Sequence, residues 1–156
     1  MDRFVSHVTM RLDAKGRVSI PASFRAVLAK DGYEGLYLHP SLDQPALDAG
    51  GNALVREIER LLLQYDPFSD AWDAFATALH GDSEQLKIDG EGRMQLSERL
   101  KERALIKDET TFVGLGHKFQ IWEPQRFAAH RSEATEKVRA FRRELGSRPP
   151  SGARDQ

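Results

Sequence analysis

A turn motif that occurs twice constrains the fold of this 156-residue chain more than any other feature. Residues 12–21 read LDAKGRVSIP, and residues 88–97, at an offset of 76, read IDGEGRMQLS. Because both copies carry the same apolar spacing on either side, they indicate an internal structural repeat. The repeated loop positions are Asp13, Gly16 and Arg17 in the first copy and Asp89, Gly92 and Arg93 in the second.

Each residue type in this motif has a physical role in a tight turn. An aspartate at the start accepts hydrogen bonds from backbone amides further along, and the glycine supplies the positive φ that the reversal needs. The arginine that follows can pair back to the aspartate or project outward. The plain interpretation is that this pair only closes the turn, but two copies favour a shared functional role.

Alternating apolar and polar residues predict short strands, whereas longer segments have the spacing of helices. Residues 41–52 are rich in Pro, Gly, Asp and Asn, which predicts a loop. The hydrophobic side chains of the two helices expected after this loop are more typical of a core than of an interface. The expected strands lie within 7–13, 18–20, 35–40, 84–96 and 110–122, and the expected helices cover 21–32, 53–65, 69–81, 97–106 and 124–145.

One copy alone, with a few short strands and a small helix, cannot cover its own sheet edges. Two copies can interlock into one closed body with a pseudo-twofold axis. Such a body presents its two loops on the same side. We therefore expect an α+β fold in which both arginine loops share one surface.

The formal net charge of −1 conceals a segregated charge distribution. Residues 1–25 carry a net charge of +3, residues 43–91 carry −8, and residues 126–156 carry +4. A basic surface that faces away from an acidic body suits a protein that binds a polyanion. An ordinary solvated surface is the alternative for any one of these segments.

The sequence lacks the residue patterns that disulfides, metal sites and catalytic sites require. No cysteine is present, which excludes disulfides and thiolate sites and is compatible with a reducing cytoplasm. The five histidines are scattered, and no catalytic motif, signal peptide or membrane-spanning segment is recognisable. We expect a soluble, cytoplasmic protein that is not an enzyme, with no catalytic residues, metal, cofactor, small-molecule substrate or membrane partner.

The segments LDAKGRVSIPASFR and IDGEGRMQLSERLKERA, together with FVGLGHKFQIWEP, resemble the MraZ family of bacterial transcriptional regulators. The resemblance implies a β-barrel of two tandem SpoVT/AbrB-type swapped-hairpin units with pseudo-twofold symmetry, and helices between and after them. The implied boundaries are 7–54 for the first unit, 55–82 for a helical connection, 83–126 for the second unit, 127–145 for a C-terminal helix and 146–156 for a disordered tail.

The function implied by the resemblance is sequence-specific binding of double-stranded DNA at short direct repeats in the protein's own promoter. The implied protein is a ring-shaped homo-oligomer at the nucleoid that represses the division and cell-wall gene cluster. The residues expected to bind DNA are Lys15, Arg17 and Arg93, those expected to orient the loops are Asp13, Gly16, Asp89 and Gly92, and those expected to add phosphate contacts are Arg3, Arg11 and Arg25. For these last three arginines, a role in surface solubility is the alternative.

The second loop departs from the first at one charged position, where Glu91 replaces Lys15. A carboxylate close to phosphate groups is repulsive, so we expect the first loop to carry more of the DNA affinity. A ring whose loops bind an acidic protein is the alternative function. The helix expected near the C-terminus has a narrow apolar stripe that is closer to a partner contact than to a core face. This stripe consists of Phe127, Ala134, Val138, Phe141 and Leu145.

Overall fold

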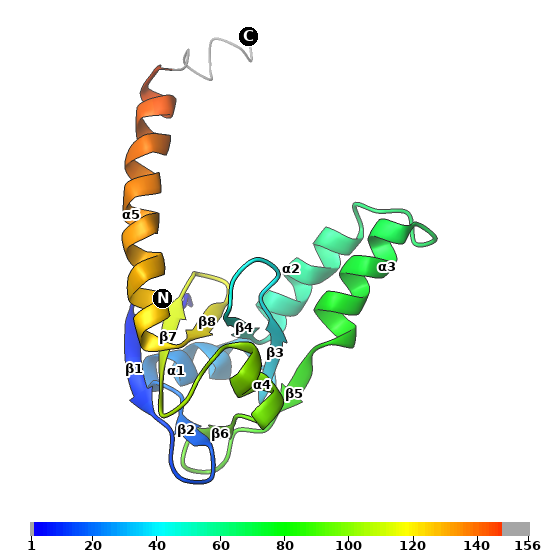
Figure 1. The fold of residues 1–156 in the computed structure, drawn as a ribbon. Helices are drawn as coiled ribbons and strands as arrows, with labels where there is room; N and C mark the ends of the chain where they lie inside the picture. Colours follow the sequence, from blue (N-terminus) through cyan, green and yellow to red (C-terminus); the bar gives the residue numbers. More distant parts are fainter. Residues whose placement is uncertain (1, 148–156) are drawn as a thin grey trace. The chain divides into compact units, whose positions relative to one another are not determined.

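The computed structural model describes residues 2–147 and has a mixed α+β fold with antiparallel sheets (Figure 1). This confirms the expected fold class. The chain up to Pro124 forms one compact unit, and the helix residues from Gln125 onward form a second. No helix within residues 2–147 has the length and apolar character needed to cross a bilayer.

The two copies of the repeat give the same order of elements. The first copy forms β1 (His7–Arg11), β2 (Arg17–Ser19), α1 (Ala22–Asp31), β3 (Leu36–Pro40) and β4 (Leu47–Gly50). The second forms β5 (Glu84–Leu86), β6 (Arg93–Gln95), α4 (Glu98–Arg103), β7 (Glu109–Gly114) and β8 (Phe119–Trp122). Between them lie α2 (Asn52–Leu62), α3 (Asp70–Ala76) and the π-helical turn η1 (Thr77–Gly81), and after them lies α5 (Pro124–Ser147).

Strands of both copies share one six-stranded antiparallel sheet with the order β1-β7-β8-β4-β3-β5, in which β1 pairs with β7, β8 with β4 and β3 with β5 across the copies. Strands β2 and β6 leave this sheet and pair with each other as a separate two-stranded ribbon, at the lower end of Figure 1. Neither copy therefore completes a sheet alone. The β3–β4 and β7–β8 ladders lie within one copy, and the other four ladders join strands of different copies.

The closed barrel that we expected does not form within residues 2–147. The six-stranded sheet is open, with β1 and β5 at its two edges. The reason lies in the pairing of β2 with β6, since this ribbon forms its own sheet instead of joining β1 to β5. The C-terminal helix continues to Ser147, and residues 148–156 of the expected tail lie outside the described residues.

Two strand pairs, β2–β6 and β4–β8, each join equivalent strands of the two copies, and each is symmetric about a central residue pair. The β2–β6 ribbon is centred on the pair Val18 and Met94, which are 76 residues apart like the loops. The β4–β8 pair is centred on Asp48 and Gln120, where the side-chain amide Nε2 of Gln120 donates a 2.8 Å hydrogen bond to Oδ1 of Asp48. At this second centre the offset between the copies has fallen to 72 residues.

The expected loop over residues 41–52 is wrong at its centre, which is strand β4. Its sequence, LDAG, has little local strand character, but it is fully buried between β3 and β8 and pairs with both. Tertiary pairing therefore overrides local propensity here. The repeat itself could have revealed the strand, because the expected second-copy strands within 110–122 need counterparts after β3.

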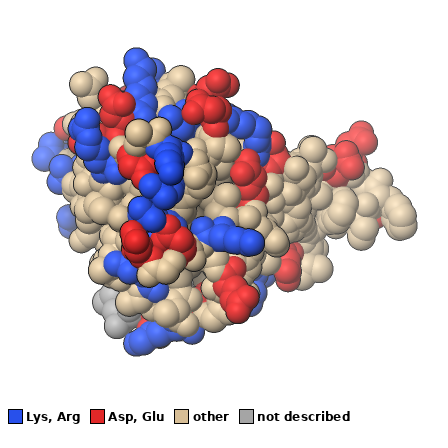
Figure 2. Space-filling view, turned by 90° about the horizontal axis from the view of Figure 1, so that it is seen from below, with Lys and Arg blue, Asp and Glu red and all other residues tan. Residues whose placement is uncertain are grey.

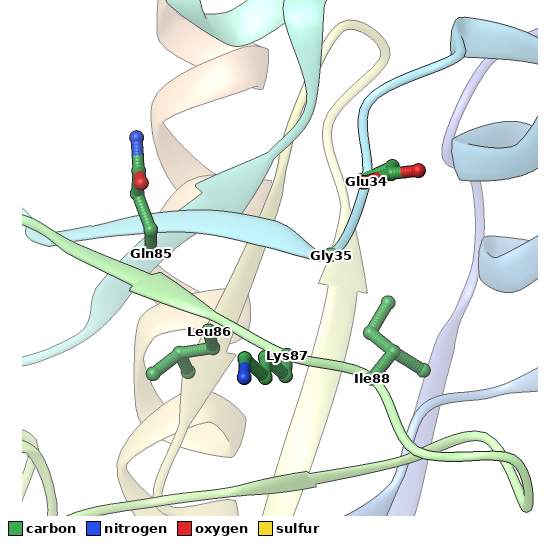
Figure 3. Close-up of a pocket in the computed structure, with 6 residues that line it drawn as sticks. All are labelled: Glu34, Gly35, Gln85, Leu86, Lys87 and Ile88. Carbon is green, nitrogen blue, oxygen red and sulfur yellow. The ribbon is translucent and has the colours of Figure 1, made fainter.

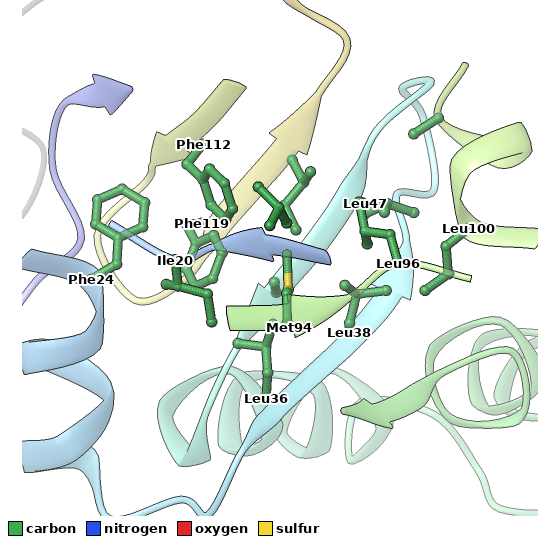
Figure 4. Close-up of a cluster of buried hydrophobic side chains, with 14 of the residues drawn as sticks. Ile20, Phe24, Leu36, Leu38, Leu47, Met94, Leu96, Leu100, Phe112 and Phe119 are labelled. Atoms are coloured by element: carbon green, nitrogen blue, oxygen red, sulfur yellow. The ribbon is translucent and has the colours of Figure 1, made fainter. Parts of the chain in front are cut away.

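One hydrophobic core draws on both copies and lies against both sheets (Figure 4). Val18 and Met94, at the centre of the β2–β6 ribbon, are each 1% exposed. Phe24 of α1 is equally buried, and its ring centroid lies 5.0 Å from that of Phe119 and 5.4 Å from that of Phe4. Folding of this core thus fixes the ribbon against the sheet.

Helices α2 and α3 pack on a second apolar cluster around Tyr37. Trp72 and Phe75 are partly buried there, in line with the expected core role of these helices. The turn between α2 and α3 is different, since Phe68 is 96% exposed and Leu63 is 85% exposed.

Replacing Phe24 with alanine should lower the free energy of unfolding by about 3–5 kcal/mol, because a large cavity opens among the surrounding aromatic rings. Urea unfolding followed by circular dichroism measures this loss. The matched control is Phe68→Ala, which removes the same side chain from an exposed position and should change the free energy by less than about 0.5 kcal/mol. Equal losses for the two variants would contradict this assignment of the core.

Candidate nucleic-acid interface

The two repeated loops have the same hydrogen-bond pattern. In the first, Oδ1 of Asp13 accepts from the backbone amides of Lys15 and Arg17, each at 2.9 Å, and Oδ2 accepts from Nε of Arg17 at 2.7 Å. In the second, Oδ1 of Asp89 accepts from the amides of Glu91 and Arg93, each at 2.9 Å, and Oδ2 accepts from Nε of Arg93 at 3.0 Å. Each arginine thus pairs back to its aspartate, one of the two arrangements that the sequence allowed.

These hydrogen bonds favour the charged form of each aspartate. The backbone N–H of Arg17 is the main cause that lowers the pKa of Asp13 below the ordinary value of 3.8. The backbone N–H of Arg93 lowers the pKa of Asp89 in the same way. Both loops therefore keep their ion pairs at neutral pH.

Each loop is also hydrogen-bonded to the other copy through its glycine. Gly16 has φ +80° and Gly92 has φ +79°, the left-handed conformation that glycine adopts without strain. The carbonyl of Gly16 accepts from the amide of Leu96 at 3.0 Å, and the carbonyl of Gly92 accepts from the amide of Ile20 at 2.9 Å. The loops are thus fixed to each other as well as to their own strands.

The β2–β6 ribbon places both arginines on one face. Arg17 lies opposite Gln95, and Arg93 lies opposite Ser19. The central residues of the two strands point into the core, so the side chains at these four flanking positions point away from it. The side chains of Arg17 and Arg93 remain 33% and 27% exposed. The structure therefore brings both arginines together at the surface.

The electrostatic environments of the two arginines differ. Oε2 of Glu91 lies 3.3 Å from Nη2 of Arg93, in addition to the ion pair with Asp89. The hydrogen bond that Arg93 donates to Asp89 is the largest cause that raises the pKa of Arg93, and the charge of Glu91 adds to it. The first loop instead has Lys15, whose side chain is exposed. The charged residues of the first loop sum to +1, and those of the second sum to −1.

Arg25 contacts the second loop, a role beyond the phosphate contact expected from the sequence. Its Nε donates a 3.0 Å hydrogen bond to the carbonyl of Ile20. A Cβ built on Gly92 would lie 2.6 Å from Nη1 of Arg25, so the guanidinium lies directly against the loop glycine. Position 25 is 76 residues before Lys101, which forms an ion pair with Glu98. The sequence signal for this difference between the two loops was that the second copy has a lysine where the first copy has Arg25.

The other two expected phosphate contacts lie at opposite ends of β1. Arg11 is the last residue of β1, two positions before Asp13, and is exposed. Arg3 precedes Phe4, which pairs with Gly116 in the turn between β7 and β8. Arg11 thus lies near the loops and Arg3 lies beside the β7–β8 turn, at the other end of the strand.

The face that carries the loops holds charges of both signs. Figure 2 shows Lys and Arg side chains over much of this face, with Asp and Glu side chains between them. Acidic side chains predominate among the charges on the part at the right of the view, formed by α2 and α3. The part of this face formed by α2 and α3 is thus mainly acidic among its charges, and the rest of the face mixes charges of both signs.

Two hollows lie away from the ribbon's arginines. One, of about 560 Å³, runs along the start of β3 and the end of β5, where Leu86, Lys87 and Ile88 line it (Figure 3). The other, of about 490 Å³, lies beside α2 and is lined in part by His39 and Asp48. Burial lowers the pKa of His39. Within residues 2–147, no group of three or more His, Cys, Asp or Glu side chains could hold a metal ion.

Comparison with known proteins identifies the family. The chain is 64% identical to the transcriptional regulator MraZ of Xanthobacter autotrophicus over 148 residues, which covers 95% of this chain and 94% of the relative. The chain belongs to the MraZ family. The MraZ protein of Azorhizobium caulinodans is also 64% identical, over 94% of both chains, and that of Beijerinckia indica is 59% identical over 99% of this chain and all of the relative.

A family profile agrees with these relatives. The profile described as "MraZ protein, putative antitoxin-like" matches residues 79–145, which include the second loop and most of α5. The relatives make this an MraZ transcriptional regulator rather than an enzyme, in agreement with the sequence analysis.

The two loops should keep their ion pairs as the pH falls through 3.8 and lose them only at lower pH. Folding lowers the pKa values of Asp13 and Asp89. The two carboxylates therefore stabilise the folded state fully at pH values above their unfolded-state pKa, and this stabilisation is lost as the pH falls through their folded-state pKa. NMR titration of the carboxyl ¹³C signals measures the pKa values of both aspartates, and the Asp13→Asn variant assigns the signal of Asp13. Midpoints equal to those in the urea-unfolded chain would contradict the loop geometry.

Proposed function

We propose that this MraZ protein binds specific DNA sequences through the face of the β2–β6 ribbon that carries Arg17 and Arg93. The observation that supports this most strongly is the shared orientation of these two side chains, each held by an aspartate in the same loop geometry. Lys15, beside Arg17, adds a third cation. Asp13, Gly16, Asp89 and Gly92 fix the loops and do not contact DNA in this proposal.

The arginine geometry suits recognition of a DNA groove. The guanidinium of Arg17 uses Nε for Asp13, and among residues 2–147 no acceptor bonds its two Nη nitrogens. Two Nη groups form the fork that matches O6 and N7 of guanine or two phosphate oxygens. A side chain held by its own aspartate also loses less conformational entropy on binding. Lys15 serves as a phosphate contact, and exposed Arg11 and Arg25 extend the same cationic surface.

The two repeat copies act as two recognition units in this proposal. The units span residues 7–54 and 83–126 and exchange strands, with residues 55–82 as a helical connection and 127–145 as a C-terminal helix. One protomer therefore presents a pair of related loops to the DNA. The loops differ in charge, so the first loop contributes more of the affinity.

Membership of the family supports a proposal for the biological target. We infer that the protein binds short direct repeats in its own promoter and represses the division and cell-wall gene cluster, in the cytoplasm at the nucleoid. A few contacts from one protomer give weak binding, so a ring-shaped homo-oligomer supports the proposal physically. Joining several loop pairs raises avidity by roughly 10²–10⁴-fold. Mass measurement of the free assembly tests the ring.

Replacing Arg17 with alanine should abolish specific promoter binding at physiological salt while the oligomer stays intact. Loss of one bidentate base contact costs about 1–3 kcal/mol per site, and the loss is repeated in every protomer. Fluorescence anisotropy with promoter repeats and with scrambled DNA measures it. The control is Arg60→Ala, which removes an exposed arginine paired with Glu57 on α2. Full binding by the Arg17 variant would refute the proposal, and equal affinity for both DNAs throughout a salt series would favour an acidic protein partner instead.

Replacing Glu91 with lysine should strengthen DNA binding, because it removes a carboxylate beside Arg93 and restores the charge pattern of the first loop. The reciprocal change, Lys15→Glu, should weaken it. The slope of log affinity against log salt concentration should become steeper for the first variant by about 1, the value for one more phosphate contact. Unchanged affinity and slope in both variants would show that the loops do not face phosphates.

A further inference from the structure

The C-terminal helix α5 carries an apolar stripe that the proposed DNA interface does not use. Ala134, Val138, Phe141 and Leu145 are spaced by four, three and four residues along the helix. Val138, Phe141 and Leu145 are 54%, 59% and 62% exposed. This spacing places the four side chains on the a and d positions of a coiled-coil heptad, with Val138 and Leu145 at a. We refer to these four residues as the α5 stripe.

We propose that the α5 stripe is an interface at which α5 pairs antiparallel with α5 of a second copy of this chain. This pairing does not depend on DNA binding. Two independent features of the helix support it, which are the sizes of the stripe residues and the charges that flank them. Both features distinguish the antiparallel arrangement from the parallel one.

The side-chain sizes are complementary only in the antiparallel arrangement. In that arrangement each a residue faces a d residue of the other helix, so Val138 faces Phe141 and Leu145 faces Ala134 of the second copy. Every layer then combines a larger side chain with a smaller one. In a parallel pair, identical residues would face each other, which places two phenylalanines in one layer and two alanines in another. Such layers pack unevenly.

The flanking charges favour the same arrangement. Lys137 and Glu144 are both at g positions, and antiparallel helices place g beside g, so two Lys137–Glu144 ion pairs form across the interface. Parallel helices place g beside e, which would bring Lys137 next to Arg142 of the other copy. The remaining described ion pair of this helix, Arg139 with Glu136, lies away from the stripe.

An antiparallel pair of identical helices has twofold symmetry, so the interface is closed and joins two copies only. The overlap covers about four layers, and short helices pair weakly in isolation. The contact is therefore expected to depend on protein concentration. It would join two protomers, or two assemblies of protomers, through residues other than those of the loops.

Disulfide trapping tests this pairing directly, because the full-length chain contains no cysteine of its own. Lys137→Cys and Glu144→Cys proteins are mixed at equal concentration and oxidised, and the heterodimer is measured on a non-reducing gel. The matched comparison is a mixture of Lys137→Cys and Arg142→Cys. The first mixture should crosslink and the second should not. Dominant crosslinking in the second mixture, or none in either at high protein concentration, would overturn the proposal.

A charge exchange provides the second test. Thr135→Cys and Arg142→Cys, which face each other across the antiparallel pair, serve as a reporter. Adding Lys137→Glu to both proteins should reduce the crosslinked fraction, and adding Glu144→Lys as well should restore it. The control is Glu133→Lys, an exposed position away from the stripe, which should leave the fraction unchanged. Because promoter binding is measured separately, a failure here leaves the DNA-binding proposal unaffected.

Discussion

The hydrogen bonds between each repeated loop and the opposite copy are the interaction on which the rest of the structure depends. The carbonyl of Gly16 accepts from Leu96, and the carbonyl of Gly92 accepts from Ile20. These bonds continue the β2–β6 ladder into the loops, so that the two aspartate–arginine pairs are fixed on one ribbon. The buried pair at the ribbon centre, Val18 and Met94, then anchors this surface to the core.

The two repeated loops differ in charge but share one hydrogen-bond geometry. The loop shape requires only the aspartate, the glycine and backbone amides, so the position held by Lys15 in one copy and Glu91 in the other is free to vary. Arg25 adds a cation against the second loop, where the local charge is otherwise negative. In the proposed complex, such a surface would make one stronger and one weaker DNA contact from a single protomer.

Much of the fold and of the candidate site could be predicted from the sequence, because the repeat constrains both. The motif predicted the loop hydrogen bonds and the shared surface, and the resemblance named the family. The prediction of a closed barrel was wrong because β2 pairs with β6, a strand far away in the sequence. Alternation of apolar and polar residues predicts that a strand forms but does not reveal its partner. Strand β4 was missed because the offset between the copies shrinks from 76 to 72 residues, so a constant alignment places Leu47–Gly50 on the start of α5.

In the proposed complex, both loops of one protomer face the same DNA duplex. The structure of the assembled protein on a promoter fragment that contains the direct repeats tests it most directly. We expect the guanidinium groups of Arg17 and Arg93 both to lie within hydrogen-bond distance of bases or phosphates of that duplex. A complex in which the duplex occupies another face, with the β2–β6 ribbon in solvent, would contradict it.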